Sequence, residues 1–102
     1  MVLTVTTQQE LTGLLEANRT VVVFVSCESP RDYSFSDLFH RFSESNYSKG
    51  AICIKVPTEI YSQNPVINEP KVIVYVNNNP LARWQGCGGF LDFIRPRLSQ
   101  KL

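Results

Sequence analysis

The side chains best suited to chemistry in this sequence are three cysteines and a single histidine. The cysteines are Cys27, Cys53 and Cys87, and their spacing forms no Cys-x-x-Cys pair. An odd number of cysteines at irregular spacing predicts neither a disulfide framework nor a zinc site. The sequence therefore predicts no metal and no cofactor.

A polar segment, Ser29-Pro30-Arg31-Asp32, follows an apolar run and could hold a nucleophile. The Ser29 hydroxyl is not ionised at neutral pH, so it would need a neighbouring base to act as one. The only histidine, His40, comes eleven residues later, about three helical turns away, and we expect it on the polar face of a helix. Serine suits a helix N-cap, proline the first helical position and aspartate the first turn. The segment therefore predicts the start of a helix.

Helix and strand patterns alternate along the chain. Thr7-Gln8-Gln9-Glu10 has the form of a capping box and predicts a helix over 7–18. The β-branched and aromatic run 20–25 predicts a strand covered on both faces. Further along, an apolar stripe at helical spacing predicts a second helix; its members are Phe35, Leu38, Phe39 and Phe42. The other expected elements are strands near 3–5, 51–56, 72–76 and 81–85, a tight turn at 77–80, and a last helix around 91–98 that Pro96 would kink or shorten.

Composition limits the class of protein. A chain of 102 residues predicts one domain, 1–102. Its net charge of +1, with both signs scattered, predicts no nucleic-acid partner and no membrane-surface partner. Neither a membrane-spanning run nor a signal peptide is recognisable, so we expect a cytoplasmic or other intracellular location.

The order of these elements predicts an α/β fold, with a mixed sheet between helices on both faces. This order, with the spacing of Phe24, Pro70 and Gly86, resembles thioredoxins over nearly the whole chain. The resemblance implies a three-layer sandwich with a mixed sheet of four to five strands and residues 20–25 in the central strand. It also implies a cis peptide bond between Glu69 and Pro70, and a third helix reduced to a turn between residues 56 and 70.

The same resemblance decides what chemistry to expect. Thioredoxins carry Trp-Cys-Gly-Pro-Cys after the central strand, and the family spacing puts the two cysteine positions at Ser29 and Asp32. A buried aspartate and a lysine that move protons in thioredoxins would fall, by the same register, at Val23 and Cys53. Because none of these positions keeps the required group, the sequence predicts a redox-inactive domain that acts as a protein-interaction or complex-assembly subunit.

An alternative hypothesis is an atypical thiol–disulfide oxidoreductase that uses Cys27, Cys87 or both. In the family, the position of Cys87 lies on the substrate-facing rim near the proline loop. A third hypothesis, a small-ligand binder in the same groove, has no phosphate loop or metal cluster to support it.

The family's peptide-binding surface is the expected site for a protein partner, which includes an extended peptide segment. Trp84 is expected to pack in the hairpin and not to anchor the partner. The sequence does not give the oligomeric state. The expected partner-binding residues are Ser29, Pro30, Arg31, Asp32, Glu69, Pro70, Lys71, Gly86 and Cys87.

Overall fold

The computed structural model gives five strands and three helices within the residues that it describes. These are residues 2–26, 30–45, 48, 50–57, 60, 71–85 and 89–99, with side chains described except at 30–34, 85, 95 and 97–99. In chain order the elements are β1 (Val2–Thr4), α1 (Gln8–Ala17), β2 (Thr20–Ser26), α2 (Pro30–Glu44), β3 (Ile52–Pro57), β4 (Lys71–Val76), β5 (Asn79–Gln85) and α4 (Phe90–Ser99).

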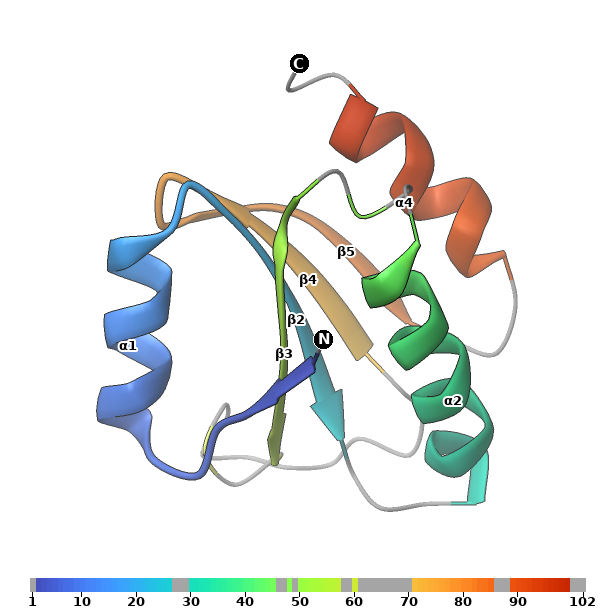
Figure 1. Cartoon of the computed structure of the whole chain (residues 1–102), viewed down its shortest axis with the longest axis horizontal. Coiled ribbons are helices and arrows are strands. Elements are labelled where there is room, and N and C mark those ends of the chain that lie inside the picture. Colours follow the sequence, from blue (N-terminus) through green and yellow to red (C-terminus); the bar gives the residue numbers. More distant parts are fainter. Residues whose placement is uncertain are drawn as a thin grey trace.

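The five strands form one mixed sheet in the order β1-β3-β2-β4-β5 (Figure 1). β1 and β2 run parallel to β3 on either side of it, whereas β4 is antiparallel to both β2 and β5. β2 is thus the middle strand, which confirms the predicted central strand at residues 20–25.

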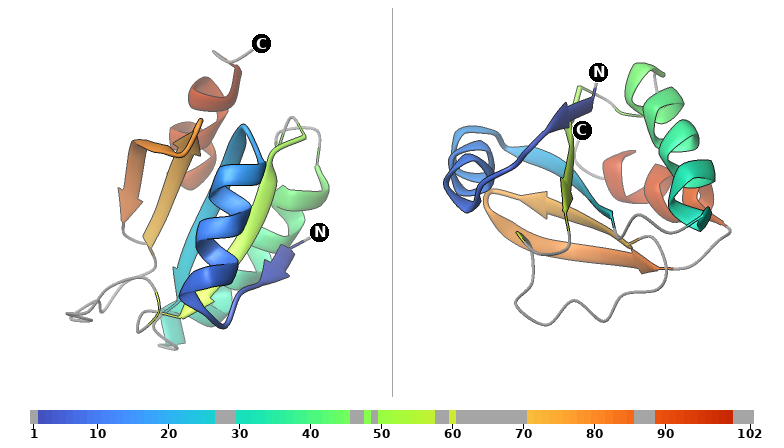
Figure 2. Two further views of the ribbon diagram at one scale, coloured as in Figure 1. Left: turned by 90° about the vertical axis from the view of Figure 1, so that its left-hand side faces the viewer. Right: turned by 90° about the horizontal axis from the view of Figure 1, so that it is seen from below.

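Helices cover the sheet on both faces. α1 lies against one face, and α2 and α4 lie against the other, an arrangement that the two further views also show (Figures 1 and 2). The predicted three-layer α/β architecture is confirmed, with five strands in the sheet.

Alternate residues of β2 supply the centre of two separate hydrophobic clusters. Val21, Val23 and Val25 pack with α1 on one face, and Val22 and Phe24 pack with α2 and α4 on the other. All five side chains are fully buried. This is why the run lacks polar residues: a strand covered on both faces has no solvent side.

The cluster on the α2–α4 face is mainly aromatic. The Phe35 ring lies 4.9 Å from the Trp84 ring in a stacked geometry and 4.9 Å from the Phe24 ring edge-on, measured between centroids. Phe39 contacts the rings of Phe42 and Phe90. Trp84 is only 9% exposed, which confirms its predicted packing role.

The start of α1 follows its sequence pattern. Thr7 has extended backbone angles, and its hydroxyl accepts a hydrogen bond from the Glu10 amide at 3.2 Å. The Glu10 carboxylate accepts hydrogen bonds in return from the Thr6 hydroxyl and the Thr7 hydroxyl. The capping box predicted from residues 7–10 is therefore present, extended by one residue toward the N-terminus.

Two predicted details are wrong. Leu38 does not join the buried stripe of α2, because 36% of it is exposed at the edge of the helix interface. Pro96 does not shorten the last helix, since α4 continues to Ser99; the kink, which was the other predicted effect, stays a prediction. Proline lacks an amide hydrogen, so the helix at this point has one fewer backbone donor.

The turn between β4 and β5 agrees with prediction, although β5 begins earlier than expected, at Asn79. Asn77 and Asn78 have φ values of 51° and 66°, the left-handed conformation that asparagine tolerates and that tight hairpins require. The predicted cis bond at Glu69–Pro70 falls outside the described residues. Of the predicted turn, only Pro57, which ends β3, and Ile60, which is helical, are described, so both stay predictions.

Candidate functional site

The candidate site lies at one end of the sheet, along the edge formed by the strand ends, where β2 ends and α2 begins. β2 ends at Ser26 and α2 starts at Pro30, in keeping with the predicted helix start. Proline is well suited to the first helical position because its missing amide hydrogen would have no partner there. Arg31 and Asp32 follow in the first turn, so the backbone of these three residues is placed by a 15-residue helix that packs through Phe35 and Phe39.

Strand pairing brings two more chain segments to the same edge. Lys71, the first residue of β4, pairs with Val25 of β2 on one side and with Gln85, the last residue of β5, on the other. Val25, Lys71 and Gln85 therefore lie side by side. They are at or next to the strand ends that lead to Cys27, Pro70 and Gly86. Segments far apart in the sequence are brought together here by the sheet alone.

Part of the predicted site falls outside the described residues. Pro30, Arg31 and Asp32 are placed by their backbone in α2, and Lys71 is placed with its side chain. Lys71 is the first residue of β4 and is half-buried. The positions that are not described are Cys27, Ser29, Glu69, Pro70, Gly86 and Cys87.

The two positions assigned to proton transfer need a correction. Val23 and Cys53 do not face each other: Val23 is opposite Ile54, and Cys53 is opposite Val22 on the other face of the sheet. The residue beside Val23 is therefore Ile54, because neighbouring positions of a strand point to opposite faces. Both Val23 and Ile54 are 0% exposed, so this place beneath the site holds two apolar side chains and no ionisable group.

Cys53 is unsuited to thiol chemistry. Only 2% of it is exposed, and its Sγ donates a weak hydrogen bond to the Ala51 carbonyl oxygen at 3.9 Å. Burial raises the pKa of its thiol from 9.0 to about 11, so it is protonated at neutral pH. A reactive cysteine needs the thiolate and access to solvent, and Cys53 has neither.

One charged residue near the site was not singled out from the sequence. Lys55 interrupts the apolar strand β3, and its Nζ lies 5.8 Å from the centroid of the Phe24 ring. An ammonium over an aromatic face is stabilised by the ring quadrupole. The signal in the sequence was a lone lysine within the run 51–56, and strand alternation places it on the face of the sheet that α2 covers.

Other kinds of site have little support within the part of the chain that the structure describes. There, no group of three histidine, cysteine, aspartate or glutamate side chains is placed to hold a metal ion. His40 is exposed on α2, as predicted. None of the described helices is long and apolar enough to cross a membrane.

Known structures with the same architecture include several thioredoxins. The crystal structure of Schistosoma mansoni thioredoxin superposes with a TM-score of 0.78 at 19% identity, covering 99% of this chain and 95% of that one. Oxidised Plasmodium falciparum thioredoxin gives 0.77 at 20% identity, covering 99% and 98%. Malassezia sympodialis thioredoxin gives 0.78 at 11% identity, covering 98% and 90%.

At the level of sequence, no protein-family model and no curated protein matches the chain. The structural similarity extends over almost the whole chain, so the thioredoxin-like fold predicted from the order of elements is confirmed. The chain has the thioredoxin fold.

Proposed function

We propose that this chain is a redox-inactive thioredoxin-fold domain that acts as a protein-interaction or complex-assembly subunit. The observation that carries the proposal is the start of α2, where Ser29-Pro30-Arg31-Asp32 stands in place of a cysteine pair. A thioredoxin-type reaction needs a thiolate near this helix N-terminus and a second thiol to resolve the mixed disulfide. Serine and aspartate supply neither.

The surroundings of the site support the same conclusion. Val23 and Ile54 are buried against each other without a carboxylate, so the described core beneath the site has no group that could accept a proton from a thiol. What the fold retains is the row of strand ends at Val25, Lys71 and Gln85. In thioredoxins the chain beyond these strand ends pairs with an extended substrate peptide, and we infer that a segment of a partner protein docks at the same place here.

The proposal is tested by reversing charge in the first turn of α2. Arg31→Glu should lower the affinity for a co-purifying protein partner by about 30-fold, since losing a buried interfacial charge pair costs about 2 kcal/mol or more. The fold should hold, because a carboxylate in the first turn of a helix is favoured by the helix dipole. Affinity measured by titration and melting temperature measured by circular dichroism should therefore change independently.

Arg41→Glu is the matched control. Arg41 lies near the other end of the same helix, is 77% exposed, and forms an ion pair with the surface residue Asp37 at 3.0 Å. This variant carries the same change of charge and should bind the partner with the affinity of the wild type. Equal affinity for wild type, Arg31→Glu and the milder Lys71→Gln would show that the partner does not use this edge of the sheet.

A further inference from the structure

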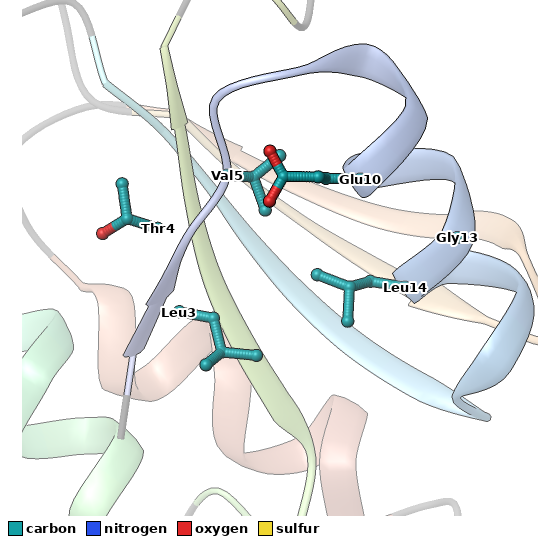
Figure 3. A pocket seen from close by; sticks show the side chains of 6 residues that line it. All are labelled: Leu3, Thr4, Val5, Glu10, Gly13 and Leu14. Atoms are coloured by element: carbon teal, nitrogen blue, oxygen red, sulfur yellow. The ribbon is translucent and has the colours of Figure 1, made fainter.

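A second surface feature lies on the opposite face of the sheet from α2, between β1 and α1. It is a hollow of about 430 Å³, here called the β1–α1 groove, shown in Figure 3. The side chains seen there come from the edge strand and the residue after it, and from one side of α1. The groove is lined by Leu3, Thr4, Val5, Glu10, Gly13 and Leu14.

The Glu10 carboxylate is the charged group of the groove, and its position is fixed by local hydrogen bonds. Its Oε1 accepts from the Thr6 hydroxyl at 3.0 Å, the Thr7 hydroxyl at 3.2 Å and the Thr6 amide at 3.4 Å. The Thr6 hydroxyl, then the Thr6 amide and the Thr7 hydroxyl, lower the pKa of this carboxyl group, so it carries a negative charge at neutral pH. All three of these hydrogen bonds go to Oε1.

Gly13 leaves the wall of the groove open. Glycine in a helix interior is unfavourable, and a Cβ built at Gly13 would meet no atom within 4 Å. No neighbouring group in the described structure therefore requires a glycine here. Gly13 lies between Glu10 and Leu14 along α1 and lines the groove without a side chain.

The other side of the groove is an edge strand with one neighbour. β1 pairs only with β3 in the described sheet. The Val5 amide donates to the Lys55 carbonyl oxygen at 2.9 Å, so the adjacent Thr4 directs its own amide and carbonyl away from β3, to the open side. Those groups are able to pair with a further strand.

Helix and strand spacings match across the groove. Glu10 and Leu14 are four residues apart on α1, a rise of about 6 Å. Two residues in an extended peptide span about 6.7 Å and point to the same side. A strand lying along β1 would therefore bring one side chain to the Glu10 carboxylate and the side chain two positions away to the apolar surface of Leu14 and Leu3.

We propose that the β1–α1 groove is a second docking site, separate from the edge beside α2, which takes an extended peptide segment carrying a basic and an apolar side chain two positions apart. The carboxylate selects the basic side chain, Leu3 and Leu14 the apolar one, and the open edge of β1 the extended backbone. A small organic cation would use the carboxylate alone and leave the unpaired strand edge unused, so the geometry favours a peptide.

The test uses a library of labelled heptapeptides that combine Arg or Lys with Leu or Val at alternate positions, with Thr, Ser and Val elsewhere. A second library with the same composition places the basic and apolar residues next to each other, where they point to opposite sides of a strand. Binding is measured by fluorescence anisotropy and mapped by amide chemical shifts. We expect binding of the first library only, with shifts at Leu3 to Val5 and at Gly13.

Variants then separate the contributions. Two variants should each lower the affinity for the tightest-binding peptide at least roughly tenfold. Glu10→Gln keeps an oxygen for the capping hydrogen bonds, and Gly13→Leu fills the groove. Glu16→Gln is the matched control on the exposed side of the same helix and should have no effect. Glu10→Arg should bind the peptide in which Glu replaces the basic residue.

Several outcomes would overturn the proposal. They are failure of the whole alternating library to bind, equal binding of the two libraries, shifts confined to α2 and β4, and unchanged affinity in both Glu10→Gln and Gly13→Leu. Displacement of the peptide by n-butylammonium at equal affinity would show that the groove takes a small cation and no peptide. None of these results depends on the function proposed for the edge beside α2.

Discussion

At the scale of single residues, the thiol of Cys53 is the group whose chemistry the fold alters most clearly. Its pKa is raised by burial from 9.0 to about 11. Below pH 9 the thiol is protonated in the folded and the unfolded chain, and its contribution to stability is fully present. Above pH 9 the unfolded chain releases the proton while the folded chain keeps it, so stability falls with rising pH until about pH 11.

This gives a prediction for alkaline conditions. The free energy of unfolding should fall by up to about 1.4 kcal/mol per pH unit between pH 9 and pH 11 through Cys53. In Cys53→Val that part of the slope should vanish, while the contributions of lysine and tyrosine remain in both proteins. Urea denaturation at a series of pH values measures the difference, and parallel curves for the two proteins would disprove the assignment.

Gly13 gives a second prediction at this scale. Gly13→Ala should raise the free energy of unfolding by about 0.5–1 kcal/mol, because alanine restricts the unfolded chain and its Cβ meets no atom within 4 Å. Thermal unfolding followed by circular dichroism is the measurement. A lower melting temperature would mean that Gly13 is needed for a contact that the described structure does not contain.

At the scale of elements, the phenylalanine side chains of α2 pack on the sheet and so fix the position of the helix start at the site. Phe39 is 0% exposed and contacts four other rings, whereas its neighbour Leu38 is 36% exposed. Phe39→Ala should cost about 3–5 kcal/mol through lost burial and the cavity left behind. Such a loss would use up a large share of the stability of a domain of this size.

Leu38→Ala is the comparison for Phe39→Ala. It changes a residue in the same helix turn whose side chain is 36% exposed, so we expect a smaller loss, of about 1–2 kcal/mol. Trp84 fluorescence reports unfolding in both variants, since its ring stacks on Phe35 in the same cluster. Equal losses would show that α2 packs on the sheet in another orientation.

The elements differ in how well the sequence predicted them, for physical reasons. β2 was predicted because a strand buried on both faces must be apolar throughout, and α1 because its capping box consists of local contacts. The exposure of Leu38 depends on where α2 crosses the sheet, which helical spacing alone does not give. The face of Cys53 depends on the register with β2, and a shift of one residue reverses it.

At the scale of the whole molecule, the fold gathers distant segments where β2 ends. The sequence predicted this edge as the site through the resemblance to thioredoxins. The pairing of Lys71 with Val25 and Gln85 brings the strand ends together, and their role as a site stays a proposal. The β1–α1 groove was not predicted, because Glu10 is fully explained by the capping box in the sequence. Its second role follows only from the position of α1 beside the edge strand.

The whole molecule thus offers two surfaces, one where β2 ends and α2 begins and one between β1 and α1. The edge beside α2 is the proposed place for a protein partner, and the β1–α1 groove is the proposed place for an extended basic peptide. A domain with two such surfaces could hold two segments at once. This is the property expected of an assembly subunit, and it requires no turnover.

The most direct test of the central claim is the reduction of insulin disulfides by the intact protein in the presence of dithiothreitol. The account predicts no acceleration over dithiothreitol alone, because the sequence contains no Cys-x-x-Cys pair and Cys53 is buried and protonated. Turnover above that background, lost in Cys27→Ser or Cys87→Ser, would contradict it and identify the chain as a thiol–disulfide oxidoreductase.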